Sequence, residues 1–231
     1  MVDFSSQPTM RGFFSPQRYE ADILDCEVMG QIPTDLDGQF VRLGGDWFYP
    51  PKFPDDAPLH SDGHMSRFRF KNGRVSYKSK FVRTERFLSN LEAGRQQFGY
   101  YRNRQTDDPQ VRGLDGTVAN TTPFAFAGKL MALKEDGLPH LIDPDTLATT
   151  GRWDFGGKYE SLTFTAHPKV DPVTGEQEYN WSDYTGDFLL PDQVMWDGTG
   201  TKPNPCYQIV ADPVTGWKVI ISCVGVKNYR G

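Results

Sequence analysis

The sequence predicts an all-β fold, and three observations support that prediction. Residues 64–70 and 74–82 alternate apolar and polar side chains on either side of Asn72-Gly73, a pair typical of a tight hairpin turn. Residues 117–155 have the pattern of a meander, in which short strands follow one another through turns. Strands and helices do not alternate along the chain, so a parallel sheet of βαβ units is not expected.

The meander contains four short strands, which is the unit of a propeller blade. Turn residues separate its strands at 128–129, 136–137 and 143–144. The pentapeptide Asp-Pro-Val-Thr-Gly occurs at 171–175 and again at 212–216. The two copies could be repeated blade turns or a coincidence, because Asp-Pro and Thr-Gly are common in turns. The residues thus favour a propeller-type fold without proving a repeat.

One helix is expected between the hairpin and the meander. Residues 84–99 place Leu88, Leu91 and Phe98 at helical spacing, and Thr84 is suited to cap the N-terminus.

Two further segments suggest a site. Residues 44–63 are rich in Pro and Asp and are expected to form a long loop with a surface or functional role. Residues 162–165 are apolar, β-branched or aromatic, and they predict a strand that leads to His167.

Composition excludes several classes of protein. The net charge is −5 and no basic patch stands out, so nucleic-acid binding has little electrostatic support. The three cysteines are far apart and odd in number, which argues against a disulfide framework and favours a reducing compartment. No apolar run approaches the roughly 18 residues of a transmembrane helix, and the N-terminus lacks a secretory pattern. A soluble, cytoplasmic protein is therefore expected.

Residue patterns alone do not assign a reaction. The four histidines lack the HExxH spacing of zinc enzymes, and a lone histidine is more often structural than a ligand. No nucleophile elbow or phosphate-binding glycine loop occurs. The acidic pairs Asp55-Asp56 and Asp107-Asp108 are expected to be solvated turn residues rather than glycosidase acids.

Four ordered motifs carry a resemblance to a known family. The stretches DGHMSRFRFKNGRVSYKSKFVRTER, TVANTTP, LMALKEDGLPHLIDPDTL and GRWDFGGKYESLTFTAHPKVDPVTGE resemble the carotenoid cleavage oxygenases, most closely the lignostilbene dioxygenase branch. The likeness covers about residues 12–177 and leaves a divergent tail at 178–231. It implies a seven-bladed β-propeller, with residues 1–231 forming a single, partial propeller domain.

The resemblance also implies a chemistry. Members hold a non-haem Fe(2+) on the propeller axis with four histidines, and three glutamates orient those ligands. With O2, such an enzyme would cleave the central C=C bond of a phenolic stilbene, or of a related apocarotenoid, to two aldehydes. The expected partners are this small-molecule substrate and O2, with a homo-oligomer left open.

Four residues of this chain match positions that act in the family. The resemblance implies that His167 is an iron ligand and that Glu135 orients a histidine ligand through its ring N–H. It implies that Lys134 and Tyr101 hold the phenolic hydroxyl of a stilbene. A carotenoid has no such hydroxyl, so this pair favours a stilbenoid substrate.

The sequence departs from the family pattern in one respect, because no histidine follows His167. Three explanations stay open. The chain could be a truncated or frame-shifted product of a dioxygenase gene. It could instead be a shortened, catalytically inactive relative that acts at most as a binding or interaction module. Finally, a partner chain could complete its propeller.

Overall fold

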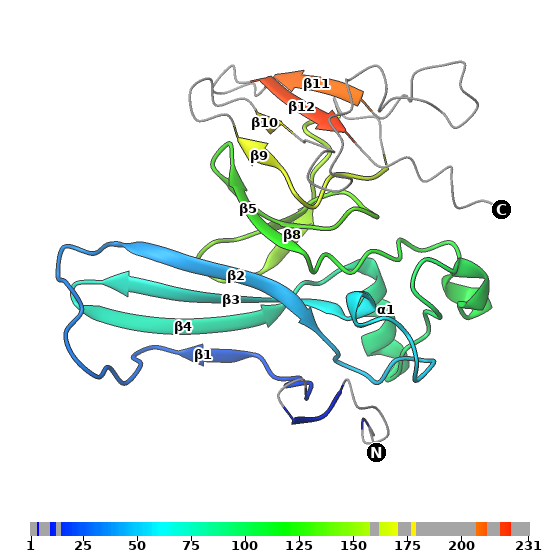
Figure 1. Cartoon of the computed structure of the whole chain (residues 1–231), viewed down its shortest axis with the longest axis horizontal. Helices are drawn as coiled ribbons and strands as arrows, with labels where there is room; N and C mark the ends of the chain where they lie inside the picture. Colours follow the sequence, from blue (N-terminus) through cyan, green and yellow to red (C-terminus); the bar gives the residue numbers. More distant parts are fainter. Residues whose placement is uncertain are drawn as a thin grey trace.

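Three four-stranded sheets succeed one another along the chain (Figure 1). The computed structural model describes residues 4, 10–12, 15–157, 162–170, 177–178, 207–211 and 218–222. In that part of the chain strands predominate, as the sequence predicts, and a single α-helix is present. None of the helices described there is long and apolar enough to cross a bilayer.

The first sheet has the strand order β1-β4-β3-β2 and is antiparallel throughout. Its strands are β1 (Ala21–Ile23), β2 (Gly38–Asp46), β3 (Asp62–Lys71) and β4 (Arg74–Phe81). The predicted hairpin at Asn72-Gly73 is confirmed. Both residues have positive φ, 52° and 72°, which is the conformation that a two-residue hairpin turn requires.

The helix forms where it is predicted but ends earlier and buries a different face. Helix α1 (Glu85–Ala93) begins after Thr84, whose hydroxyl accepts a hydrogen bond from the Phe87 N–H at 3.0 Å. Gly94 adopts φ +67° and stops the helix, because glycine takes this left-handed conformation without steric cost. The prediction that Leu88 and Leu91 form a buried apolar face is wrong, because both side chains are exposed.

Polar side chains on α1 are buried instead. The Arg86 side chain reaches the start of β3, where its Nη1 atom donates to Oδ1 of Asp62 at 2.8 Å. Its Nη2 atom donates to Oε1 of Gln96 at 3.1 Å. Asn90 donates to the same oxygen of Gln96 at 2.7 Å. The helix is therefore held to the first sheet by a buried ion pair with its amide partners and by the buried ring of Phe87, which stacks on Phe81 of β4.

The second sheet is the predicted meander, with strand order β5-β6-β7-β8. Its strands are β5 (Thr122–Phe126), β6 (Lys129–Leu133), β7 (His140–Ile142) and β8 (Thr149–Arg152). All neighbouring pairs are antiparallel.

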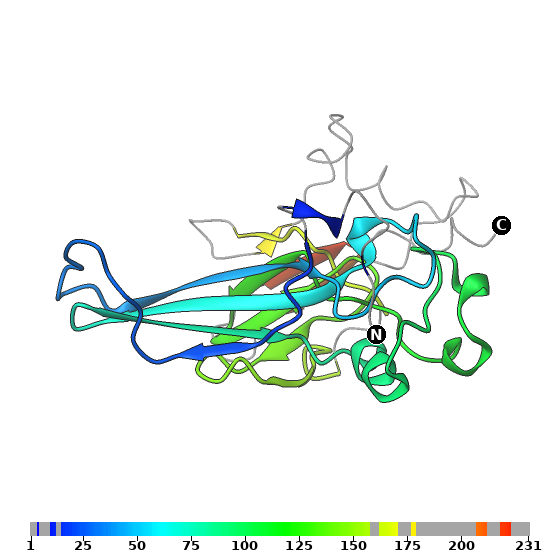
Figure 2. The same cartoon turned by 90° about the horizontal axis from the view of Figure 1, so that it is seen from below.

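Strand β6 is buried on both faces. Met131 and Leu133 point into one apolar cluster, which includes Phe155 and Phe164. Ala132 points the other way, as alternation along a strand requires, into a second cluster with residues of the first sheet. The first two sheets therefore pack against each other, and they lie one over the other in both views (Figure 1 and Figure 2).

The third sheet has the order β11-β12-β10-β9, from β9 (Lys169–Val170), β10 (Gln177–Glu178), β11 (Tyr207–Ala211) and β12 (Lys218–Ser222). Strands β9 and β10 pair antiparallel, as do β11 and β12. Both copies of Asp-Pro-Val-Thr-Gly fall between paired strands, but the pentapeptides themselves lie outside the described residues.

The strand expected at residues 162–165 is not formed. Phe164 donates its N–H to the Gly137 carbonyl at 2.9 Å, but the segment makes no ladder. Its burial is as expected from Thr163 to Ala166, whereas Leu162 is exposed. This segment packs against the turn after β6 and so carries His167 towards that turn.

Candidate functional site

The turn after β6 positions two of the predicted site residues. Lys134 and Glu135 follow the last residue of β6 and precede Asp136-Gly137. The hydroxyl of Thr117 donates to Oδ1 of Asp136 at 2.7 Å. A Cβ at Gly137 would lie 2.7 Å from Cβ of Thr117, so only glycine allows this close approach. The turn is thereby fixed, together with the two side chains before it.

Lys134 is a buried cation, with 4% of its side chain exposed. Its Nζ atom lies 5.4 Å from the centroid of the Tyr101 ring and 3.6 Å from Oε2 of Glu135. Burial of an ammonium group is costly unless charge or a π-system compensates it, and here both do. Lys134 is therefore not a solvated surface lysine.

Tyr101 lies in a turn that a carboxylate holds in place. Its N–H donates to Oδ1 of Asp56 at 2.7 Å. The guanidinium carbon of Arg102 lies 5.0 Å from the centroid of its ring, on which Lys134 also rests. The structure thus brings Tyr101 and Lys134 together, as the resemblance implies, from separate parts of the fold.

His167 meets Glu135. Its Nε2 atom lies 3.3 Å from Oε1 of Glu135, whose side chain is 10% exposed. The N–H of His167 donates to Oγ1 of Thr165 at 3.1 Å, which holds the backbone next to the imidazole. The other carboxylate oxygen of Glu135 is buried without a hydrogen-bond partner. A carboxylate beside an imidazole can fix the orientation of the ring, the role that such groups have next to metal ligands.

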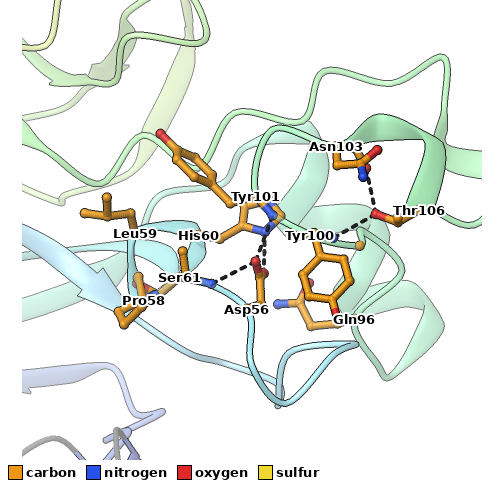
Figure 3. A network of polar contacts seen from close by, with 12 residues as sticks. Asp56, Pro58, Leu59, His60, Ser61, Gln96, Tyr100, Tyr101, Asn103 and Thr106 are labelled. Carbon is orange, nitrogen blue, oxygen red and sulfur yellow. Dashed lines mark hydrogen bonds and ion pairs between the residues drawn. The ribbon is translucent and has the colours of Figure 1, made fainter. Parts of the chain in front are cut away.

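Asp56 and His60 form a second polar cluster beside Tyr101 (Figure 3). His60 ends the 3₁₀-helix η3 (Pro58–His60), and its Nδ1 atom lies 2.7 Å from Oδ2 of Asp56. Burial, followed by the positive charge of Arg86, lowers the pKa of His60, so the imidazole is neutral at pH 7. The aspartate accepts hydrogen bonds, so Nδ1 of His60 carries the proton and donates it.

One residue of each acidic pair, Asp56 and Asp107, is buried and not solvated as the sequence suggests, whereas Asp55 is exposed. Asp56 is 7% exposed and Asp107 is 3% exposed, and each accepts hydrogen bonds from backbone N–H groups. Asp56 contacts the predicted site residue Tyr101, and the sequence did not single it out. The available signal was its spacing of four residues from His60, in the Pro-rich loop for which the sequence predicts a surface or functional role.

The histidines do not gather into a metal site. His64 and His140 are held in the sheets, and burial lowers the pKa of His140 to about 4. Among the described residues, which include all four histidines, no three His, Cys, Asp or Glu side chains come together as metal ligands would. The donor set therefore fits iron only in part: His167 offers one imidazole and Glu135 the carboxylate that would orient it.

Comparison with known proteins gives this geometry a context. The model of the retinal pigment epithelial membrane protein (RPE65) family matches residues 14–191, which extends past the expected limit at 177. Resveratrol cleavage oxygenase 1 of Aspergillus fumigatus is 45% identical over 218 residues, which is 94% of this chain and 41% of that protein. Lignostilbene-α,β-dioxygenase isozyme III of Sphingomonas paucimobilis is 44% identical over 175 residues, 76% of this chain and 36% of the relative.

Solved structures of the same group of oxygenases also match this chain. The crystal structure of Pseudomonas brassicacearum lignostilbene dioxygenase matches with a TM-score of 0.72 and 41% identity, over 76% of this chain and 36% of that chain. A cobalt-substituted apocarotenoid oxygenase of Synechocystis matches with a TM-score of 0.57 and 32% identity, over 70% and 36% of the two chains. The cobalt shows that this relative holds a metal.

These matches are extensive in this chain but partial in its relatives. The chain spans about a third to two-fifths of the length of the curated relatives that it matches, from 30% to 41%. The described sheets correspond to part of the carotenoid oxygenase structures, and the four predicted site residues contact one another in series, from Tyr101 through Lys134 and Glu135 to His167. By sequence and by fold, the chain belongs to the RPE65 family, the carotenoid cleavage oxygenases.

Proposed function

We propose that the protein acts in the oxidative cleavage of phenolic stilbenes, as a non-haem Fe(2+) dioxygenase that converts the central C=C bond to two aldehydes. Relatives with substantial identity are named as resveratrol cleavage oxygenases and a lignostilbene dioxygenase. An apocarotenoid oxygenase also matches, at a lower identity of 34%. A phenolic stilbene is therefore the preferred substrate class and an apocarotenoid the alternative.

One observation carries the proposal: the four predicted site residues form a continuous series of contacts. The Tyr101 ring lies beneath the ammonium of Lys134, which lies beside Glu135. Glu135 in turn meets His167. A group able to bind a phenol therefore adjoins a group able to bind a metal. This is the arrangement that cleavage of a bond near a phenol ring requires.

The residues at the phenol end have a clear chemical role. A hydrogen bond from the Lys134 ammonium to a phenol oxygen, together with its charge, would lower the pKa of the phenol. Electron density from the phenol oxygen would then enrich the conjugated olefin. The hydroxyl of Tyr101 would share the contact and orient the ring. Binding energy at this end would fix the position of the double bond relative to His167.

At the other end, His167 would be one iron ligand and Glu135 would hold its ring in place. Bound Fe(2+) would supply the position at which O2 is activated. Among the described residues, none of the chain's other histidines joins His167, and a second copy of this chain is one source of the remaining ligands. An oligomer is part of the proposal for this reason.

The same reasoning extends to the architecture. We propose that the three sheets are successive blades of a partial seven-bladed propeller that occupies residues 1–231 as one domain. The packing of the first sheet against the Ala132 face of β6 supports stacked blades. Composition favours the cytoplasm as the place where the protein acts.

A second candidate is a stilbene-binding module without catalysis. It is favoured by the incomplete donor set around His167 among the described residues. In that case Tyr101 and Lys134 would still recognise the phenol.

The two candidates predict different products. Purified protein is reconstituted anaerobically with Fe(2+), its iron content is measured, and 4-hydroxystilbene is added in air. A dioxygenase yields bound iron together with 4-hydroxybenzaldehyde and benzaldehyde, which chromatography separates. A binding module yields saturable stilbene binding, measured by fluorescence, without either aldehyde. Absence of both binding and cleavage would overturn both candidates.

A further inference from the structure

The buried carboxylate of Asp56 accepts three hydrogen bonds. Its Oδ1 atom accepts the N–H of Tyr101 at 2.7 Å and the N–H of Ala57 at 2.9 Å. Its Oδ2 atom accepts from Nδ1 of His60 at 2.7 Å. The side chain is 2% exposed, so these bonds are shielded from water. The carboxylate therefore ties the loop before η3 to the turn that carries Tyr101 (Figure 3).

His60 extends this connection from the backbone to the ring of Tyr101. The centroids of the two rings lie 5.5 Å apart, and the indole of Trp47 borders the imidazole at 6.4 Å in an edge-on arrangement. The imidazole is thus held by the aspartate at Nδ1 and packed against two aromatic rings. The imidazole therefore packs beside the Tyr101 ring and restricts the space into which that ring can move.

The neighbouring pair of residues shows a contrasting arrangement. The hydroxyl of Tyr100 donates to Oδ1 of Asp55 at 2.9 Å, at an exposed position. Its ring stacks on Phe53 with the centroids 4.3 Å apart. Asp55 therefore bears the same charge one residue away and also contacts a tyrosine, but it does not touch Tyr101. The chain offers a matched control for Asp56.

We propose that Asp56 and His60 are positioning residues, which set the backbone and ring of Tyr101 so that its hydroxyl and the Lys134 ammonium can meet one phenol oxygen. This inference rests on the proposed recognition of a phenol by that pair. Neither residue is assigned contact with the substrate. Their effect is on geometry, and a polar contact loses most of its strength when its partners are misplaced by about 1 Å.

Three substitutions test the idea. Asp56→Ala removes every bond to Tyr101, Ala57 and His60. Asp56→Asn keeps an acceptor for the Tyr101 N–H but turns an amide NH2 group towards Nδ1 of His60, so the imidazole must change tautomer or rotate. Asp55→Ala removes the exposed carboxylate as a control. The affinities of 4-hydroxystilbene and of trans-stilbene are measured by fluorescence titration, and the ratio of the two is compared among the proteins.

The proposal predicts that Asp56→Ala lowers the preference for 4-hydroxystilbene roughly five- to tenfold, with the affinity for trans-stilbene changed little. Asp56→Asn should give a smaller loss, and Asp55→Ala should keep the wild-type ratio. Equal losses for both ligands would indicate a merely structural role and overturn the proposal, as would an unchanged ratio. If Asp56→Ala does not fold, Asp56→Asn decides between these outcomes. A wild-type ratio of one would instead overturn the phenol site itself.

Discussion

The Nε2 atom of His167 lies 3.3 Å from Oε1 of Glu135, and this contact joins the segment after β8 to the turn after β6. It depends on the hydrogen bond from Phe164 to Gly137 at 2.9 Å and on the burial of the Phe164 ring in the apolar cluster of the second sheet. The core of the second sheet thus positions the imidazole.

We expect Glu135 to set the affinity of His167 for a metal. Glu135→Gln removes the negative charge beside the imidazole, and loss of such a partner commonly lowers metal affinity about 10- to 100-fold. Titration with Co(2+), followed by calorimetry, measures the change. Glu92→Gln, at an exposed position on α1, is the control and should bind as the wild type does. Equal affinity in all three proteins would show that Glu135 does not act on the metal ligand.

Gly63 should be intolerant of a side chain. A Cβ there would lie 2.2 Å from the carbonyl oxygen of Ala119 and 2.7 Å from that of Val118. The N–H of Gly63 donates to the carbonyl oxygen of Val118 at 2.9 Å, and this bond links β3 to the segment before the second sheet. Gly63→Ala should therefore lower the free energy of unfolding by about 1–3 kcal/mol or more.

The control for this change is Gly44→Ala, because nothing lies within 4 Å of a Cβ at that position on the paired strand β2. Urea denaturation of both variants compares their stabilities. A Gly63→Ala protein as stable as Gly44→Ala would mean that residues 118–119 do not lie against the backbone of Gly63 as these distances require.

His140 should make stability depend on pH. Burial lowers the pKa of His140 to about 4 in the folded protein, whereas an unfolded histidine titrates near 6.5. The neutral imidazole therefore stabilises the fold above about pH 6.5, and that contribution is lost as the pH falls towards 4. The loss amounts to roughly 3 kcal/mol for a shift of this size.

Substitution separates this contribution from those of other groups. Urea denaturation at pH 7 and pH 4.5 gives the drop in unfolding free energy for the wild type and for His140→Gln, which stays neutral at both values. The drop should be smaller in the variant. An identical drop in the two proteins would show that His140 titrates normally when folded.

Local signals predicted much of the fold. Asn72-Gly73 placed the hairpin because a turn of positive φ is encoded by two adjacent residues. The meander was predicted from the alternation and turns of residues 117–155. The buried face of α1 could not be predicted in the same way. Arg86 is buried because Asp62 and Gln96 reach it, and that partnership depends on tertiary packing that periodicity does not encode.

The candidate site likewise contains residues that the sequence predicted and one that it did not. Motifs located Lys134, Glu135 and His167, and the structure places them in contact, although their metal and phenol roles stay predictions. Asp56 was expected to be solvated because an acidic pair in a Pro-rich loop usually is. Its hydrogen bond to Tyr101 spans 45 residues, and only the folded chain brings the two together.

Recognition of a phenol by Lys134 is tested most directly by the affinity of 4-hydroxystilbene relative to trans-stilbene in the wild type and in Lys134→Met. Lys129→Met, at an exposed position on β6, is the matched control. We predict that the wild type and the control favour the phenol, and that Lys134→Met loses roughly tenfold or more of that preference, because hydrogen bonds to charged groups are worth about 1.5–3 kcal/mol. The same preference in Lys134→Met as in the wild type, or no preference in the wild type, would show that Lys134 does not recognise a phenol.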